Sequence, residues 1–118
     1  MIEAALLFPV LVAVLFLIID GGRLMGSRVM LSQATTAATR AQCLSSTTAA
    51  SALDQAARDA APMLSGVAVS GFTCTGTCPG FPRAKGDVVT TTVQYSFVAG
   101  YFSSFSKTLS QTSRMVCE

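Results

Sequence analysis

The residues in this sequence that are most able to do chemistry are its four cysteines, Cys43, Cys74, Cys78 and Cys117. Four cysteines allow three disulfide pairings, and two bridges are the expected outcome in a small exported domain. Cys74 and Cys78 are a close pair in a glycine-containing turn, which would leave Cys43 to reach Cys117. That second bridge, from a helix to the end of the last strand, would clamp the sheet onto the helix.

Two other uses of the cysteines fit the spacing less well. A zinc ribbon needs two closely spaced pairs, whereas this chain has one, Cys74 and Cys78. A redox motif normally has two residues between its cysteines, and here there are three. We therefore expect structural disulfides, with no metal site and no other cofactor.

The rest of the sequence offers little material for catalysis. The chain has no histidine and six acidic residues, so a serine nucleophile would lack its usual base. Asp20, Asp54 and Asp59 are best interpreted as helix-edge or solvated charges. The eight basic residues are scattered and the net charge is +2, which argues against a nucleic-acid-binding face. We expect neither enzyme activity nor a small-molecule substrate.

An apolar run, Ala4 to Ile19, opens the chain between Glu3 and Asp20 and contains Pro9. As a helix at about 1.5 Å per residue it would extend roughly 24 Å, slightly less than the roughly 30 Å hydrocarbon core of a bilayer. The two carboxylates would then lie near the interfaces, where a charge costs much less than at the centre. The run therefore predicts one membrane span.

A cleaved signal peptide and a buried core helix are the alternatives for this run. A signal peptide has a basic front and a small-residue cleavage site, whereas here the front is acidic and Gly21-Gly22 leads into Arg23 within continuing helix. A core helix would need more cover than the small, polar remainder of the chain supplies.

The charges after the run give a conflicting orientation. Arg23, Arg28 and Arg40 would place the rest of the chain in the cytoplasm by the positive-inside rule. The cysteines favour an oxidising compartment instead. A basic leader preceding residue 1 would resolve the conflict.

The remaining hundred or so residues suit one small domain. The helical pattern continues from Gly22 to about Leu44 with an apolar stripe of mostly small residues: Leu24, Leu31, Ala34, Ala38 and Ala41. Gly22 and Gly26 have the spacing that lets two helices approach closely, or else Gly21-Gly22 kinks or locally melts the helix. Residues 45–48 break this stripe and are expected to form a loop or a bend.

A second helix is predicted from about Ala49 to Ala61, ended by Pro62 and Gly66. Asp54 and Arg58 are spaced for an ion pair on the face away from its apolar residues.

Three strand-like segments follow, at residues 67–73, 87–98 and 108–117. The second alternates best and predicts one apolar face made of Val89, Thr91, Val93, Tyr95 and Phe97. In the third segment Leu109, Met115 and Cys117 share a face. A sheet this small needs cover on its apolar side, which the helical stripe can supply.

The predicted fold is therefore α+β, with a long N-terminal apolar helix, a second short helix and a small three-stranded antiparallel sheet. We expect residues 1–21 to be the membrane or filament-core segment, residues 22–65 to form periplasmic or extracellular helices, and residues 66–118 to form the sheet.

Three motifs in this order resemble the TadE/TadG-like pilins and pseudopilins of the tight-adherence branch of type IV pili. The first two are Glu3-Ala4-Ala5-Leu6-Leu7-Phe8-Pro9 before the apolar run and Ile18-Ile19-Asp20-Gly21-Gly22-Arg23-Leu24 before an alanine-rich helix. The third is Thr108-Leu109-Ser110-Gln111-Thr112-Ser113-Arg114-Met115, close to the terminal Glu118. The likeness spans almost the whole chain.

The resemblance implies a pilin-like fold and a precursor whose short leader is cut by a prepilin peptidase at the inner membrane. An assembly ATPase and a platform protein would then move the subunit into an extracellular filament made of copies of itself. The acid of this family usually lies five residues after the cut, whereas here it is Glu3. Either the mature chain begins at Met1 with a shifted acid, or the numbering begins at an internal methionine.

Elementary energetics give Glu3 a role in such a filament. An apolar helix leaves lipid only if copies of itself bury it, and an unpaired carboxylate inside that bundle would be costly. The expected partner of Glu3 is the α-amino group of Met1 on its own or a neighbouring chain. The residues expected at the assembly interface are Met1, Glu3, Phe8, Pro9, Gly22 and Gly26.

The function expected from the sequence is that of a structural pilin in an adhesive filament. Two alternatives remain open. One is a minor pseudopilin that primes the assembly machinery. The other is a single-span, membrane-anchored binding module that uses the Arg83-Ala84-Lys85 loop as its contact surface.

Overall fold

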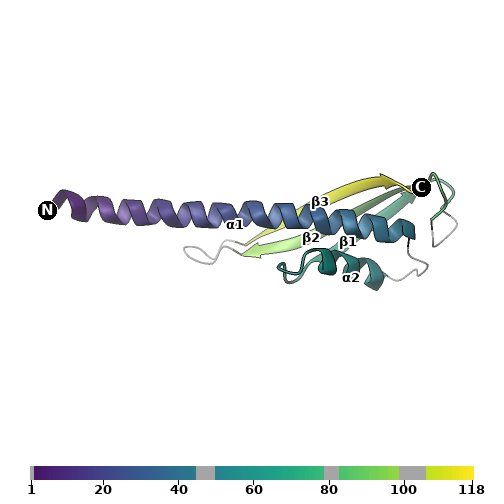
Figure 1. Cartoon of the computed structure of the whole chain (residues 1–118), viewed down its shortest axis with the longest axis horizontal. Coiled ribbons are helices and arrows are strands. Elements are labelled where there is room, and N and C mark those ends of the chain that lie inside the picture. The colour runs from purple at the N-terminus through teal and green to yellow at the C-terminus, as the bar shows by residue number, and fades with distance from the viewer. Residues whose placement is uncertain (1, 45–49, 79–82, 99–105) are drawn as a thin grey trace.

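The computed structural model describes residues 2–44, 50–78, 83–98 and 106–118. Its elements, in chain order, are α1 (Ile2–Leu44), α2 (Ala50–Ala60), β1 (Ala68–Thr75), β2 (Val88–Val98) and β3 (Ser106–Val116). The C-terminal half of α1, α2 and the sheet form a small head, from which the first half of α1 projects as a bare rod (Figure 1). The predicted α+β fold is confirmed.

α1 is one continuous helix of 43 residues. Pro9 lies inside it and lacks a backbone N–H, so one hydrogen bond of the helix ladder is missing there. The helix also continues through Gly21 and Gly22, so these glycines do not melt it. A single rod therefore connects the apolar run to the head.

The sheet has the order β1-β2-β3 with both neighbouring pairs antiparallel. β2 is the central strand, and its predicted apolar face is the face turned toward the core, where Val89, Val93 and Phe97 are buried. Tyr95 on that face lies opposite Leu109 of β3. The residues at which the strands begin and end differ from the prediction by at most two positions.

One face of α1 covers the sheet. Leu31, Ala34 and Ala38 are buried against Val93 and Phe97, as the small-residue stripe predicted. Two threonines also lie on this buried face. The hydroxyl of Thr35 donates to the carbonyl of Leu31, and the hydroxyl of Thr39 donates to the carbonyl of Thr35, in each case one turn back along the helix. The buried hydroxyls are therefore satisfied within the helix.

Asp54 and Arg58 take a different role from the predicted solvent-facing ion pair. The Oδ1 atom of Asp54 accepts a hydrogen bond of 2.7 Å from the N–H of Val69. The Nε of Arg58 donates to the carbonyl of Val67 at 3.4 Å. Both side chains therefore hold the backbone that enters β1 against α2, a long-range use that helical spacing cannot reveal.

Two disulfides close the head. The bond between Cys43 and Cys117 joins the last turn of α1 to the end of β3 across 74 residues, with 5.4 Å between the Cα atoms. The bond between Cys74, near the end of β1, and Cys78 joins residues separated by four positions in the sequence. A cross-link restricts the unfolded chain more when it closes a longer loop, so the first bond should stabilise the head more.

Replacing each disulfide in turn tests this difference. The chain-entropy relation gives a loss of about 4 kcal/mol for the C43S/C117S variant and about 2 kcal/mol for the C74S/C78S variant. Thermal unfolding of the full chain in detergent micelles, followed by circular dichroism, should therefore show the lower midpoint for C43S/C117S. An equal or lower midpoint for C74S/C78S would contradict this account of the clamp.

Candidate membrane and assembly surface

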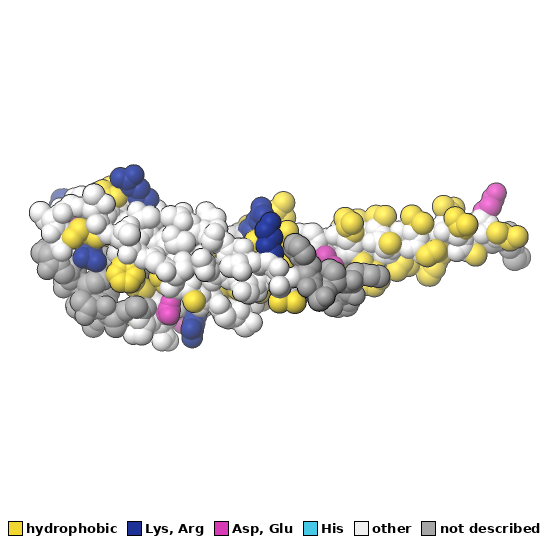
Figure 2. Space-filling model, turned by 180° about the vertical axis from the view of Figure 1, so that it is seen from behind, with side chains coloured by type: hydrophobic (Ala, Val, Ile, Leu, Met, Phe, Trp, Pro, Cys, Tyr) yellow, Lys and Arg dark blue, Asp and Glu magenta, His cyan; other side chains and the backbone are white. Residues whose placement is uncertain are grey.

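Residues 2–19 of α1, hereafter the tail, form a largely apolar rod in which most side chains are exposed. Ile2, Leu6 and Leu17 are among its exposed apolar side chains, and exposed apolar side chains run along the rod in Figure 2. α1 is also long and apolar enough to cross a membrane. An apolar surface this large on a protein marks a membrane or protein interaction site.

One apolar face of the tail continues along α1 into the region of the head. Steps of four and three residues along α1 place one set of side chains on a single face, which we call the outward seam. The outward seam consists of Phe8, Leu11, Leu15, Ile18, Gly22, Met25 and Val29. Met25 and Val29 are 64% and 59% exposed although they lie at or beyond the start of the head.

The outward seam and the sheet occupy opposite sides of α1. The buried residues of α1 begin at Ser27 and include Leu31 and Ala38. At about 100° per residue, Val29 and Leu31 are separated by roughly 200° around the helix axis. The head therefore leaves the outward seam open along its whole length.

The predicted interface glycines lie on or next to this open face. A Cβ atom added to Gly22 or to Gly26 would meet no atom of the described residues within 4 Å. Packing within this chain therefore does not require glycine at either position. A neighbouring helix could approach the backbone closely there.

Charged residues bound the tail at both ends. Glu3 lies in the first turn of α1, where the helix dipole favours a carboxylate. Asp20 is partly buried, and its Oδ1 has no hydrogen-bond partner in the part of the chain that the structure describes. Met1, the expected partner of Glu3, lies outside the described residues, so that pairing remains a prediction. Phe8 and Pro9 are exposed in the tail.

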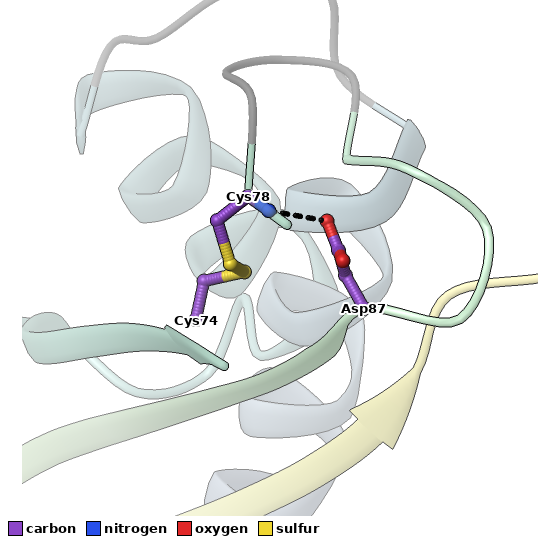
Figure 3. Close-up of side chains that lie close together, drawn as sticks. All are labelled: Cys74, Cys78 and Asp87. Atoms are coloured by element: carbon purple, nitrogen blue, oxygen red, sulfur yellow. Dashed lines mark hydrogen bonds between the residues drawn. A yellow bond between two sulfur atoms is a disulfide. The ribbon is translucent and has the colours of Figure 1, made fainter. Parts of the chain in front are cut away.

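At the end of the head far from the tail, Cys74, Cys78 and Asp87 form a cluster of side chains (Figure 3). One potential ligand atom from each residue lies within 4.8 Å of the others. Both sulfur atoms are committed to a disulfide, however, and a metal is held by thiolates. The cluster is therefore a structural feature of the loop between β1 and β2.

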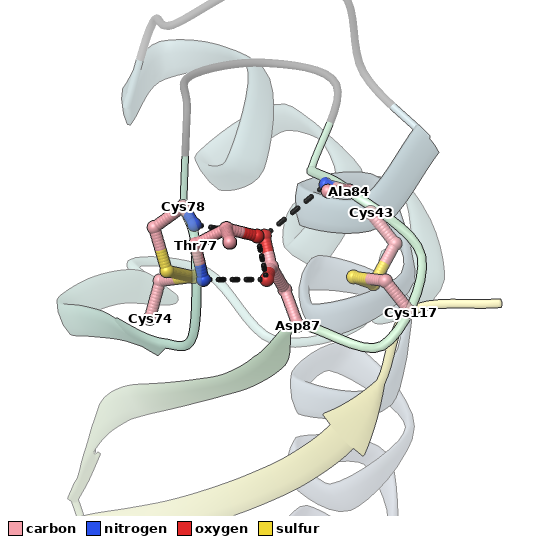
Figure 4. Close-up of a disulfide and its surroundings, with 7 residues drawn as sticks. All are labelled: Cys43, Cys74, Thr77, Cys78, Ala84, Asp87 and Cys117. Atoms are coloured by element: carbon pink, nitrogen blue, oxygen red, sulfur yellow. Dashed lines mark hydrogen bonds between the residues drawn. A yellow bond between two sulfur atoms is a disulfide. The ribbon is translucent and has the colours of Figure 1, made fainter.

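Asp87 clamps this loop. The residue is 2% exposed, and its Oδ1 accepts hydrogen bonds from the N–H and the hydroxyl of Thr77, at 3.0 and 2.9 Å. Its Oδ2 accepts from the N–H of Cys78 at 3.1 Å and from that of Ala84 at 3.2 Å (Figure 4). A Cβ on Gly76 would lie 2.5 Å from Oδ1, so glycine is required beside the clamp.

The sequence pattern did not predict the Asp87 clamp. We interpreted the Arg83-Ala84-Lys85 segment as a possible contact surface. The backbone N–H of Ala84, at the centre of this segment, donates to Asp87, and a contact role for the segment stays a prediction. The signal available in the sequence was the polar turn composition around Thr77 and Asp87, which does not indicate which carboxylate meets which amide.

The environment of Asp87 alters its acidity. Burial raises the pKa of this carboxyl, but the hydrogen bonds from Thr77, Ala84 and Cys78 lower it more in total. The net pKa lies below the ordinary value of 3.8. Because the unfolded chain binds the proton more tightly, the clamp contributes fully above about pH 3.8 and is lost as the pH falls through the folded-state pKa.

Comparison with protein families matches residues 1–40 to the family described as TadE-like protein. The match covers the tail and most of α1, and it confirms the resemblance over that segment. Comparison with curated proteins and with solved structures gives no match. Together with the exposed tail, the family match fits a pilin-like, membrane-anchored protein associated with a tight-adherence pilus system.

An Asp87→Asn variant tests the clamp. The asparagine amide nitrogen would face N–H donors, so the midpoint of thermal unfolding at pH 7 should fall. The midpoint should also depend less on pH than in the parent chain between pH 2 and 5. Asp59→Asn, which removes an exposed carboxylate, is the matched control and should leave both properties close to those of the parent. Identical profiles for the two variants would refute the clamp.

Proposed function

We propose that this chain is a structural pilin subunit that polymerises through α1 into an extracellular filament. The observation that carries the proposal is the length of the apolar face of α1. From Ala4 to Val29 this face extends roughly 38 Å at about 1.5 Å per residue, whereas a bilayer core is roughly 30 Å thick. The hydrocarbon core of a bilayer would cover the tail but leave Met25 and Val29 outside it.

A parallel copy of α1 would cover the entire outward seam. Alternating steps of four and three residues are the spacing that lets parallel helices pack along a shared stripe. Gly22 and Gly26 would allow close contact at the level where the head begins, because no described residue of the same chain fills that space. The head lies on the opposite side of α1 and would remain on the outside of such a bundle.

Glu3 would experience the largest change between the two settings. In the membrane it lies at the end of the span, within reach of interfacial water. In a bundle of tails it would lose that water, and a buried carboxylate needs a cation and hydrogen-bond donors nearby. We keep the α-amino group of Met1, on the same or a neighbouring chain, as the proposed partner.

The TadE-like match supports a sequence of partners for this process. A prepilin peptidase, an assembly ATPase and a platform protein would act on the chain at the inner membrane, before the filament forms outside. Copies of the chain would then be its main partners. A minor subunit that primes assembly could use the same seam, and it would be recognised by its low abundance in the fibres.

Replacing Val29 by Glu tests the outward seam outside the tail. Val29 is 59% exposed, so the isolated chain should insert and fold as before. Burying a charge between copies is unfavourable, so the amount of chain in sheared extracellular fibres should fall about tenfold or more. Gln55→Glu adds the same charge to an exposed position of α2 and should leave fibre yield unchanged.

Wild-type fibre yield from Val29→Glu would contradict packing through the outward seam. A parallel loss in both charge variants would point to a general effect of net charge.

Glu3→Ala tests the pairing at the helix tip. Because the variant leaves the tail apolar, it should reach the membrane normally. In the bundle, however, the α-amino group of Met1 would lose its proposed partner, so fibre yield should fall several-fold. Fibre yield is measured as the ratio of chain in sheared fibres to chain in the membrane fraction. Normal fibre yield with normal insertion would show that Glu3 does not determine assembly.

A further inference from the structure

A groove with two cationic side chains lies at the end of the head that faces the tail. Arg28 of α1 and Lys107 of β3 line a cavity of about 360 Å³ together with the polar residues Ser110 and Gln111. Both cationic residues are exposed. No acidic residue occurs among the described residues that line this basal groove.

The fold places Lys107 at this end. β3 runs antiparallel to β2, and Lys107 pairs with Phe97 at the close of β2. The other end of β3 leads to Cys117, which is bonded to Cys43 at the far end of α1. The start of β3 therefore lies toward the tail, as Figure 1 shows.

The position of the basal groove matches the headgroup layer of a membrane that holds the tail. Asp20 ends the apolar run, and Arg28 follows it by roughly 12 Å at about 1.5 Å per residue. Headgroups extend about 5–7 Å beyond the hydrocarbon core, and long cationic side chains reach several ångströms back toward that layer. Arg23 adds a further cation even closer to Asp20.

Exposed apolar side chains accompany these cations. Met63 and Val98 line a second cavity together with Arg23 and Gly26, and both side chains are largely exposed. A mixture of apolar and cationic side chains at one level is typical of surfaces that rest at a membrane interface.

We propose that the basal groove binds the phosphate of an anionic phospholipid headgroup and so docks the head on the membrane surface while the tail spans the bilayer. The Arg28 guanidinium can bind two phosphate oxygens, and Lys107 of β3 adds a second charge to the same lining. With no acid in the described lining to attract an ammonium group, an anionic headgroup is favoured over a zwitterionic one. The proposal requires membrane anchoring and is independent of filament formation.

The carboxylate of Glu3 on a second copy is the competing occupant. Glu3 lies about 25 residues before Arg28 on α1, so this contact would require a large axial offset between copies. The headgroup layer is within reach without any offset. We therefore commit to the lipid.

Native mass spectrometry of the full chain in nonionic detergent tests the proposal. With phosphatidylglycerol and phosphatidylcholine of identical acyl chains, the parent should retain the anionic lipid about fivefold more. The R28Q/K107Q variant should lose this preference. The R40Q/K85Q variant removes the same charge from exposed residues at the far end of the head and should keep it. All three should have similar unfolding midpoints.

Three results would overturn the proposal. Equal loss of preference in both double variants would show a general charge effect. Inorganic phosphate binding as tightly as the lipid, through the same two residues, would show a site for free phosphate. A smaller dimer fraction in R28Q/K107Q with unchanged lipid retention would assign the basal groove to a second copy.

Discussion

The structure depends on one constraint: α1 carries more apolar surface than its own head can cover. Its C-terminal half buries Leu31, Ala34 and Ala38 against the sheet, while most side chains of its N-terminal half are exposed. Bare apolar side chains in water are unfavourable by roughly 25 cal/mol for each Å². Lipid or other protein chains can remove this surface from water, and the proposed function is a change from the first setting to the second.

The proposed function requires that α1 serve both settings while the head keeps its structure. Small residues let the sheet lie close on one side of the helix, which leaves the outward seam open on the other. The disulfide between Cys43 and Cys117 joins the far end of α1 to the last strand, and Asp87 closes the adjoining loop. These bonds lie far from the tail, so changes around the tail need not disturb them.

Much of this arrangement follows from the sequence. The run from Ala4 to Ile19 is long and uncharged, and the period-two pattern around Val93 is unambiguous, so the apolar helix and the central strand could be predicted. The disulfide between Cys43 and Cys117 could also be expected, once one close cysteine pair was set aside.

Features set by long-range backbone contacts could not be predicted. Asp54 and Arg58 have the spacing of a helical ion pair, yet backbone groups at the start of β1 bind both of them. The amides that meet Asp87 come from two segments on either side of a loop, and nothing in their local pattern predicts the encounter. The outward seam is defined by the face of α1 that the head leaves open, which requires knowing where the head packs. The basal groove depends on the direction of β3, which places Lys107 at the end of the head nearest the tail.

The most direct test of the central claim is electron cryomicroscopy of fibres sheared from cells that produce this chain. The account predicts a core of parallel α1 helices in which Phe8, Ile18, Met25 and Val29 face neighbouring copies, with the sheets on the outside. Fibres that lack this chain, or fibres in which Met25 and Val29 face solvent while the sheets form the core, would contradict it.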